Sequence, residues 1–198
     1  MDVFDAMETC IAMRYLKEDL VPKGDLERLV HAATRASSPA NSQGWEFIIL
    51  DERDLKTEIG IAVAAAMGPL MDALPEAEDG TKQRMYDGTQ HLLKNFAKVP
   101  AWILVCGRLN YPPEDPSEAM MYSTIFPAAQ NLIVAARAMG LGTTFTSFHT
   151  TVEGVIQKRL DLPDDVIPCV MVAVGYPDRQ FMPVRRRPTR DVIHWNGW

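Results

Sequence analysis

The segment from Ser117 to Met139 is apolar on nearly every side when it is read as a helix. A helix of this kind has no face that prefers water, so it belongs at the centre of a domain or of an interface. Gly140 follows directly and predicts a left-handed helix end. Any fold for this chain must therefore wrap other elements around this helix. Its apolar positions include Met120, Met121, Ile125, Ala128, Ala129, Leu132, Ile133, Ala135 and Ala136.

Three short apolar runs and one segment with alternating residues, the third of the four, can supply the strands of such a fold. They lie at residues 45–50, 101–106, 143–148 and 167–174. Apolar residues at helical spacing predict further helices, which lie over 2–13, 23–36, 52–66, 90–97 and 151–160. With 198 residues, 47% of them hydrophobic, the chain is long enough to form one well-packed domain. The pattern predicts a single mixed α/β domain over residues 1–198.

Two segments depart from this regular pattern. Residues 67–90 contain two prolines and three glycines, so we interpret them as a variable excursion with one or two short helices. Such an excursion either covers a binding site or is a plain surface insertion. Residues 178–198 carry five arginines and end with Trp195 and Trp198. Two tryptophans so close to the end of the chain predict a C-terminal arm that docks onto another surface.

The charge and the motif content exclude several classes of function. A formal net charge of -6 and a pI of about 5.2 argue against binding to nucleic acids or to anionic membranes. The three cysteines and four histidines show no metal-ligand spacing, so no metal site is expected. The acidic first ten residues lack the basic start of a secretory signal, and no apolar stretch is long enough to span a membrane. We therefore expect a cytoplasmic protein.

A polar segment between helix 23–36 and strand 45–50 is the first candidate for a binding site. Residues 37–43 are rich in hydroxyl and amide side chains, which can read the edge of a ring, although the same residues also form ordinary turns. Arg14 and the arginines at 185–187 can hold a phosphate, although each also reads as a solvated cation. The strand end at 146–148 can present backbone N–H groups. A bound flavin mononucleotide (FMN) is a cofactor that needs all three features.

Several motifs occur in an order that resembles one known family. They are M-R-Y-L at 13–16, S-S-P-A-N-S-Q-G-W at 37–45, A-A-Q-N-L-I-V-A-A-R-A-M-G-L-G-T at 128–143 and V-A-V-G-Y-P at 172–177. In this order they resemble the nitroreductase family of FMN-dependent oxidoreductases. The likeness extends from about residue 8 to residue 192.

The resemblance implies an α+β fold of three layers, in which helices flank a central, mainly antiparallel sheet. It implies an intertwined homodimer with the long apolar helix at its centre and the arm 178–198 packed on the partner subunit. FMN would lie at the dimer interface, and NADH or NADPH would be the electron donor. No side chain would act as a catalytic acid or base, because the chemistry takes place at flavin N5 near the backbone of Ser147 and Phe148.

The resemblance also implies which residues bind the cofactor. In this sequence they are Arg14, Ser37, Ser38, Pro39, Asn41, Gln43, Thr146, Ser147, Phe148, Arg185 and Arg187. The chain departs from the family pattern at three places. Cys10 and Ile11 stand where the family commonly has two arginines in R-R-S-x-R, and Ser37 and Gly44 stand where prolines are usual. Ser147-Phe148 falls where the family often has Glu-Gly or Gly-Gly, but donation from the backbone does not need those side chains. The first departure removes part of the expected phosphate grip, for which Arg185 and Arg187 could compensate.

The expected function is a ping-pong oxidoreductase that passes hydride from NAD(P)H, by way of FMN, to nitroaromatics, quinones or similar small electrophiles. Two alternatives stay open. One is a degenerate flavin-binding or regulatory protein of the same fold with little turnover. The other is a specialised branch, a dehalogenase or a flavin-degrading enzyme. No sequence feature distinguishes NADH from NADPH or identifies the physiological acceptor.

Overall fold

The computed structural model describes residues 1–198 and contains one four-stranded sheet with the order β1-β2-β4-β3. All three neighbouring pairs of strands are antiparallel, which confirms the expected type of sheet. Each strand lies on one of the four predicted segments, although the third ends at Thr146 instead of residue 148, because Phe148 begins a 3-10 turn. The strands are β1 (Trp45–Leu50), β2 (Ala101–Gly107), β3 (Gly142–Thr146) and β4 (Ile167–Gly175).

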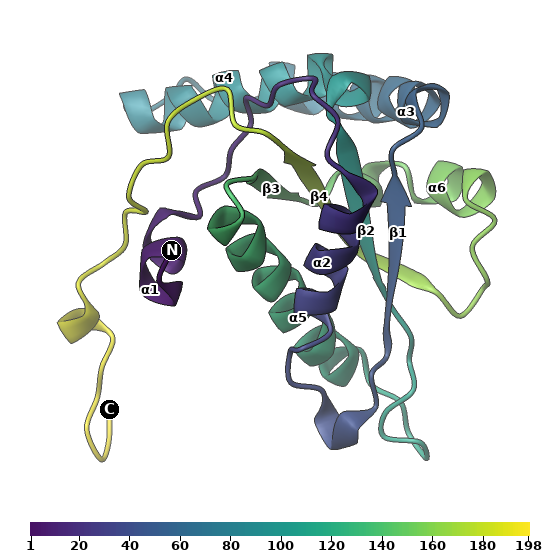
Figure 1. Cartoon of the computed structure of the whole chain (residues 1–198), viewed down its shortest axis with the longest axis vertical. Helices are drawn as coiled ribbons and strands as arrows, with labels where there is room; N and C mark the ends of the chain where they lie inside the picture. Colours follow the sequence, from purple (N-terminus) through teal and green to yellow (C-terminus); the bar gives the residue numbers. More distant parts are fainter.

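Helices cover both faces of the sheet and complete the expected three layers (Figure 1). One face is covered by α2 (Lys23–Ala33) and α5 (Glu118–Ala138). The other face packs against α3 (Arg53–Asp72), α4 (Gly80–Lys94) and α6 (Glu153–Arg159). The short helix α1 (Val3–Thr9) lies against α5. Short 3-10 turns complete the chain, namely η1 (Pro39–Asn41), η2 (Phe96–Lys98), η3 (Phe148–Thr151) and η4 (Thr189–Asp191).

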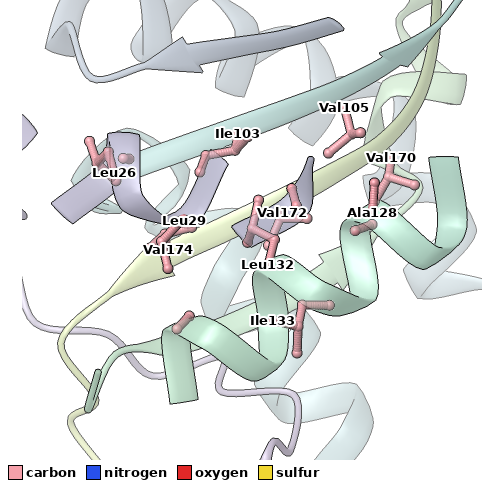
Figure 2. Packing of buried hydrophobic residues seen from close by; sticks show 14 of the residues in the cluster. Leu26, Leu29, Ile103, Val105, Ala128, Leu132, Ile133, Val170, Val172 and Val174 are labelled. Atoms are coloured by element: carbon pink, nitrogen blue, oxygen red, sulfur yellow. The ribbon is translucent and has the colours of Figure 1, made fainter. Parts of the chain in front are cut away.

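The predicted central helix is confirmed to within one residue at each end, as α5. Figure 2 shows Leu132 of α5 beside Val172 of β4 in the first of two cores, which lies between the sheet and helices α2 and α5. Alternate residues of β2 serve the two cores, Ile103 and Val105 the first and Trp102 the second, since side chains of a strand point to opposite faces. Gly140 has a φ of 81°, which confirms the left-handed helix end. No helix, α5 included, combines the length and the apolar character needed to cross a membrane.

The first helix is shorter than predicted, because α1 ends at Thr9 instead of continuing to residue 13. Beyond Thr9 the chain runs along the edge of the sheet and forms backbone hydrogen bonds with it. The N–H of Met13 donates to the carbonyl of Thr143 at 2.8 Å. The N–H of Lys17 donates to the carbonyl of Tyr176 at 2.9 Å. These tertiary hydrogen bonds outweigh the helical pattern and leave Arg14 in an extended segment.

Residues 67–90 hold longer helices than predicted. Helix α3 continues through Pro69 to Asp72, so this proline removes one backbone donor from the helix without ending it. Helix α4 starts at Gly80, where the carboxylate of Asp79 accepts hydrogen bonds from the N–H groups of Thr81 and Lys82 at 2.7 and 2.8 Å. The predicted helix 90–97 is the last turn of α4 followed by η2. The excursion therefore consists mainly of the end of α3 and the start of α4, which residues 73–79 connect.

The predicted helix 151–160 also starts later, at Glu153. The hydroxyls of Thr150 and Thr151 donate to the carbonyls of Ser147 and Phe148, at 2.9 and 2.8 Å. These hydrogen bonds close the turn η3 and leave no threonine to cap α6.

Candidate active site

A cavity of about 250 Å³ lies where the end of β3 meets α4. Three separate stretches of the chain line it: Arg14, residues 89 and 92 of α4, and residues 144–148. The structure thus brings together four of the predicted site residues, which are Arg14, Thr146, Ser147 and Phe148. Arg14 is the one charged side chain in this lining.

Arg14 is half-buried in this cavity and has no carboxylate partner within the chain. Removal from water lowers the pKa of its guanidinium, and the only opposing influence comes from the neighbouring Tyr15. An arginine stays protonated at physiological pH even so. A partly desolvated cation without a counter-ion favours the binding of an anion, because charge interactions strengthen as water is excluded.

The extended segment that carries Arg14 is fixed to β3 on its inner side. The hydroxyl of Thr144 donates to the carbonyl of Met13 at 2.7 Å, and both residues are buried. Met13 in turn donates its N–H to Thr143, as described above. The hydrogen bonds of Met13 therefore fix the position of Arg14 along the edge of the sheet.

The end of β3 shapes the other wall of the cavity. The hydroxyl of Thr146 donates to the carbonyl of Met171 at 2.8 Å, so its side chain supports the strand. Phe148 is buried, whereas Phe145 is 47% exposed. The backbone N–H of Ser147 donates to no acceptor within the chain. Ser147 is an exposed residue of the cavity lining, so its N–H is a donor that the fold does not use, in the segment for which the sequence predicted backbone donors.

The polar segment 37–43 lies at the opposite corner of the sheet (Figure 1). β1 and β3 are the two edge strands, and Thr144 is level with Leu50, the last residue of β1. The polar segment precedes Trp45, the first residue of β1. Three strand spacings and one strand length therefore separate it from the cavity, on the order of 20 Å. Within one chain the two parts of the predicted site do not meet.

Hydrogen bonds within the polar segment 37–43 hold its conformation. The hydroxyl of Ser38 accepts a hydrogen bond from the N–H of Gln43 at 2.8 Å and lies 3.1 Å from the hydroxyl of Ser42. Asn41 and Gln43 both have positive φ, at 56° and 49°. The side chains of Asn41 and Gln43 are exposed, as is that of Ser37, while Pro39 is half-buried. Nε2 of Gln43 donates to the carbonyl of Asn41 at 3.5 Å, and the side-chain amide of Asn41 has no partner within the chain. Strained backbone of this kind is typical of binding sites.

The predicted arginines of the C-terminal arm lie outside the cavity. The arm leaves the sheet beyond Pro177 and passes α1, where the N–H of Val184 donates to the carbonyl of Glu8 at 2.7 Å. Arg185 and Arg187 follow and are exposed, as are Trp195 and Trp198, 85% and 103% exposed. The structure of one chain therefore leaves both arginines available for contacts elsewhere.

A second, larger hollow of about 460 Å³ lies between α6 and the start of β4. Its charged lining residues are Glu153 and Asp164, and it contains no cation. Two carboxylates disfavour a phosphate, so we place the candidate active site at Arg14.

The sequence predictions missed four residues of the cavity: Thr89, Leu92, Thr144 and Phe145. Thr89 and Leu92 belong to α4, of which the sequence predicted only the part from residue 90 onward as helix. Thr144 and Phe145 could have been found, because they directly precede the predicted residues 146–148.

Comparisons with known proteins identify the family and the fold of the chain. The model of the Nitroreductase family matches residues 11–176. A protein of Archaeoglobus fulgidus, provisionally named NADH dehydrogenase/NAD(P)H nitroreductase, is 24% identical over 97% of this chain and 100% of its own length. The crystal structure of a protein with the same provisional name from Parabacteroides distasonis has a TM-score of 0.73 and 25% identity, and covers 99% of this chain and 98% of that one.

A third similar protein is an FMN- and NADPH-dependent nitroreductase from Sphigopyxis sp. strain HMH, solved as a point mutant. Its structure has a TM-score of 0.77 and 18% identity, with both chains fully covered. At that identity the likeness shows a shared fold. Because the family model covers most of the sequence and the fold agrees, this chain belongs to the nitroreductase family.

Proposed function

We propose that the protein is an FMN-dependent oxidoreductase that transfers reducing equivalents from NADH or NADPH to nitroaromatics, quinones or similar electrophiles by a ping-pong mechanism. The observation that carries this proposal is Arg14, a desolvated guanidinium without a counter-ion in a cavity beside the free N–H of Ser147. When bound, FMN supplies a ring that accepts and donates hydride, a chemistry that amino-acid side chains do not provide.

The residues present fit this cofactor. Arg14 would hold the phosphate, because a guanidinium offers a fork of donors to phosphate oxygens. The free N–H of Ser147 would donate to the polar part of the ring, as expected for the strand end near N5. The aromatic side chains of Phe145 and Phe148 line the same cavity and support the binding of flat, conjugated ligands.

The polar segment 37–43 would reach the same flavin from a second copy of the chain. Within one chain it lies at the other corner of the sheet, so a single flavin cannot touch both parts. Apolar side chains are left exposed on α1, on α5 and on the arm, among them Phe4 at 70%, Phe126 at 45% and Trp195 at 85%. Exposed apolar surface on this scale favours association. We therefore propose a homodimer with FMN at its interface.

The experiment for this proposal is cofactor uptake by the purified protein. After incubation with excess FMN and desalting, the protein should keep one FMN for each protomer and should have the mass of a dimer by light scattering. A colourless monomer that takes up no FMN would contradict the proposal. A protein that binds FMN but is not reduced by either nicotinamide would support the binding-only alternative instead.

A further inference from the structure

Helix α4 packs against the side chain of Arg14 at Gly88. Gly88 is buried in the interior of α4, and a Cβ atom built at this position would lie 2.9 Å from Cδ of Arg14. It would lie 3.5 Å from Cβ and 3.7 Å from Cγ of the same side chain. The aliphatic stem of Arg14 therefore lies directly against the backbone of α4, in the space that any other residue at position 88 would fill.

A glycine inside a helix weakens the helix, so its presence needs a local reason. Gly68 of α3 and Gly154 of α6 have nothing within 4 Å of an added Cβ. Gly60 of α3 faces the ring of Phe96 and serves the core. Gly88 differs from all of them, because its neighbour is the one cation that lines the cavity.

Resting on the proposed FMN function, we propose that Gly88 is a positioning residue for Arg14 and thereby determines the preference of the site for FMN over riboflavin. The absent side chain lets α4 pack onto the stem of Arg14 and shield it from water on one side. Packing then restricts the stem to one conformation, which places the guanidinium in the cavity. A methyl group at position 88 would push the stem aside and move the guanidinium with it.

The two flavins separate this role from a general effect on the fold. FMN and riboflavin share the ring and the ribityl chain and differ in the phosphate, which is the group assigned to Arg14. The dissociation constants of both flavins can be measured from the quenching of flavin fluorescence. Gly88→Ala should weaken FMN binding about tenfold, the loss expected for about 1.4 kcal/mol of a charge-assisted contact. Riboflavin binding should change by less than about twofold.

Gly68→Ala is the matched control, since it adds the same methyl group inside a helix but in open space. It should leave both dissociation constants unchanged. In an Arg14→Ala background, Gly88→Ala should have no further effect on FMN binding, because the clashing stem is gone. If Gly88→Ala alone lowers the thermal midpoint, the double variant should regain the midpoint of Arg14→Ala.

The outcomes distinguish this inference from the function on which it rests. A wild-type protein that prefers FMN over riboflavin, with the same preference kept in Gly88→Ala, would overturn the role of Gly88 only. An equal effect of Gly88→Ala on FMN binding with and without the Arg14 side chain would overturn it as well. A double variant whose thermal midpoint stays below that of Arg14→Ala would also overturn it. A wild-type protein that binds no FMN would overturn the proposed function and this inference together.

Discussion

The rings of Tyr15 and His91 stack, with their centroids 4.3 Å apart and their planes at 29°. Tyr15 follows Arg14, and His91 lies one helical turn beyond Gly88, so the stack continues the contact between α4 and the extended segment. The guanidinium of Arg179 covers the Tyr15 ring at 4.9 Å from its centroid. Tyr15 therefore joins α4, the segment of Arg14 and the start of the C-terminal arm.

Replacing this ring should loosen α4. In Tyr15→Leu the stack with His91 and the contact with Arg179 are lost, so the amides of residues 85–94 should exchange hydrogen faster while those of β4 stay protected. Tyr15→Phe keeps the ring and is the control, which should exchange like the wild type. Hydrogen exchange followed by mass spectrometry resolves the two segments. Unchanged protection of α4 in Tyr15→Leu would show that the stack contributes nothing to its docking.

His149 should make the stability of the protein depend on pH. Its side chain is 4% exposed, its Nδ1 has no hydrogen-bond partner, and burial lowers its pKa below the ordinary value of 6.5. Between the folded and the unfolded pKa the unfolded chain binds more protons, so the free energy of unfolding rises with pH across that window. This contribution is fully present above the unfolded pKa and is lost as the pH falls through the window.

The thermal midpoint should therefore be lower at pH 5.5 than at pH 7.5, and His149→Phe should reduce the difference. Burial also lowers the pKa of His91, with Arg179 acting in the same direction, so part of the slope should persist in this variant. A slope that His149→Phe leaves intact would assign the pH dependence to other groups.

Lys56 should stabilise the connection between α3 and the central strand β2. Its ammonium group donates to the carbonyls of Val99 and Pro100, at 2.6 and 2.9 Å, and the residue is 4% exposed. Lys56→Met keeps the length of the side chain but leaves two carbonyls without this donor, at a cost of about 2–3 kcal/mol in the free energy of unfolding.

Urea unfolding at a fixed protein concentration measures this loss, because the stability of an associating protein depends on concentration. Lys98→Met is the control. Lys98 forms an ion pair with Glu18 in which both side chains are at least half exposed, so its loss should cost less than about 1 kcal/mol. Equal costs for the two variants would contradict the role assigned to Lys56.

The elements that follow strong apolar patterns could be predicted from the sequence, and those decided by tertiary contacts could not. Helix α5 and the strands β2 and β4 bury continuous apolar runs, and their positions agree with the predictions. The helical pattern after Thr9 loses to hydrogen bonds with β3, such as that of Met13 with Thr143. Helix α4 contains Gly88, which reads as a breaker in the sequence and is explained only by the contact with Arg14.

The same distinction holds for the candidate site. Arg14 and residues 146–148 were predicted, and one cavity contains them. The contribution of α4 to this cavity could not be predicted, because no short motif marks Thr89 or Leu92. The segment 37–43 was predicted as part of the site, but one chain shows it at the other corner of the sheet. Its role depends on a second chain and stays a prediction.

Arg14 should account for most of the affinity for the phosphate of FMN. Arg14→Ala should raise the dissociation constant of FMN about 10- to 100-fold, which corresponds to the roughly 1.5–3 kcal/mol of a hydrogen bond to a charged group. Arg186→Ala is the control, since the Arg186 side chain is exposed on the arm and donates to the carbonyl of Arg185. Fluorescence titration of the flavin measures both. Unchanged affinity in Arg14→Ala would place the phosphate elsewhere.

The most direct test of the proposed oxidoreductase is anaerobic reduction of the FMN-loaded protein, followed by its absorbance near 450 nm. NADH or NADPH should bleach the flavin band, and a quinone or a nitroarene added afterwards should restore it while the acceptor is reduced. Both half-reactions should proceed separately, as a ping-pong mechanism requires. A flavin band that neither nicotinamide bleaches, or that no acceptor restores after bleaching, would contradict this function.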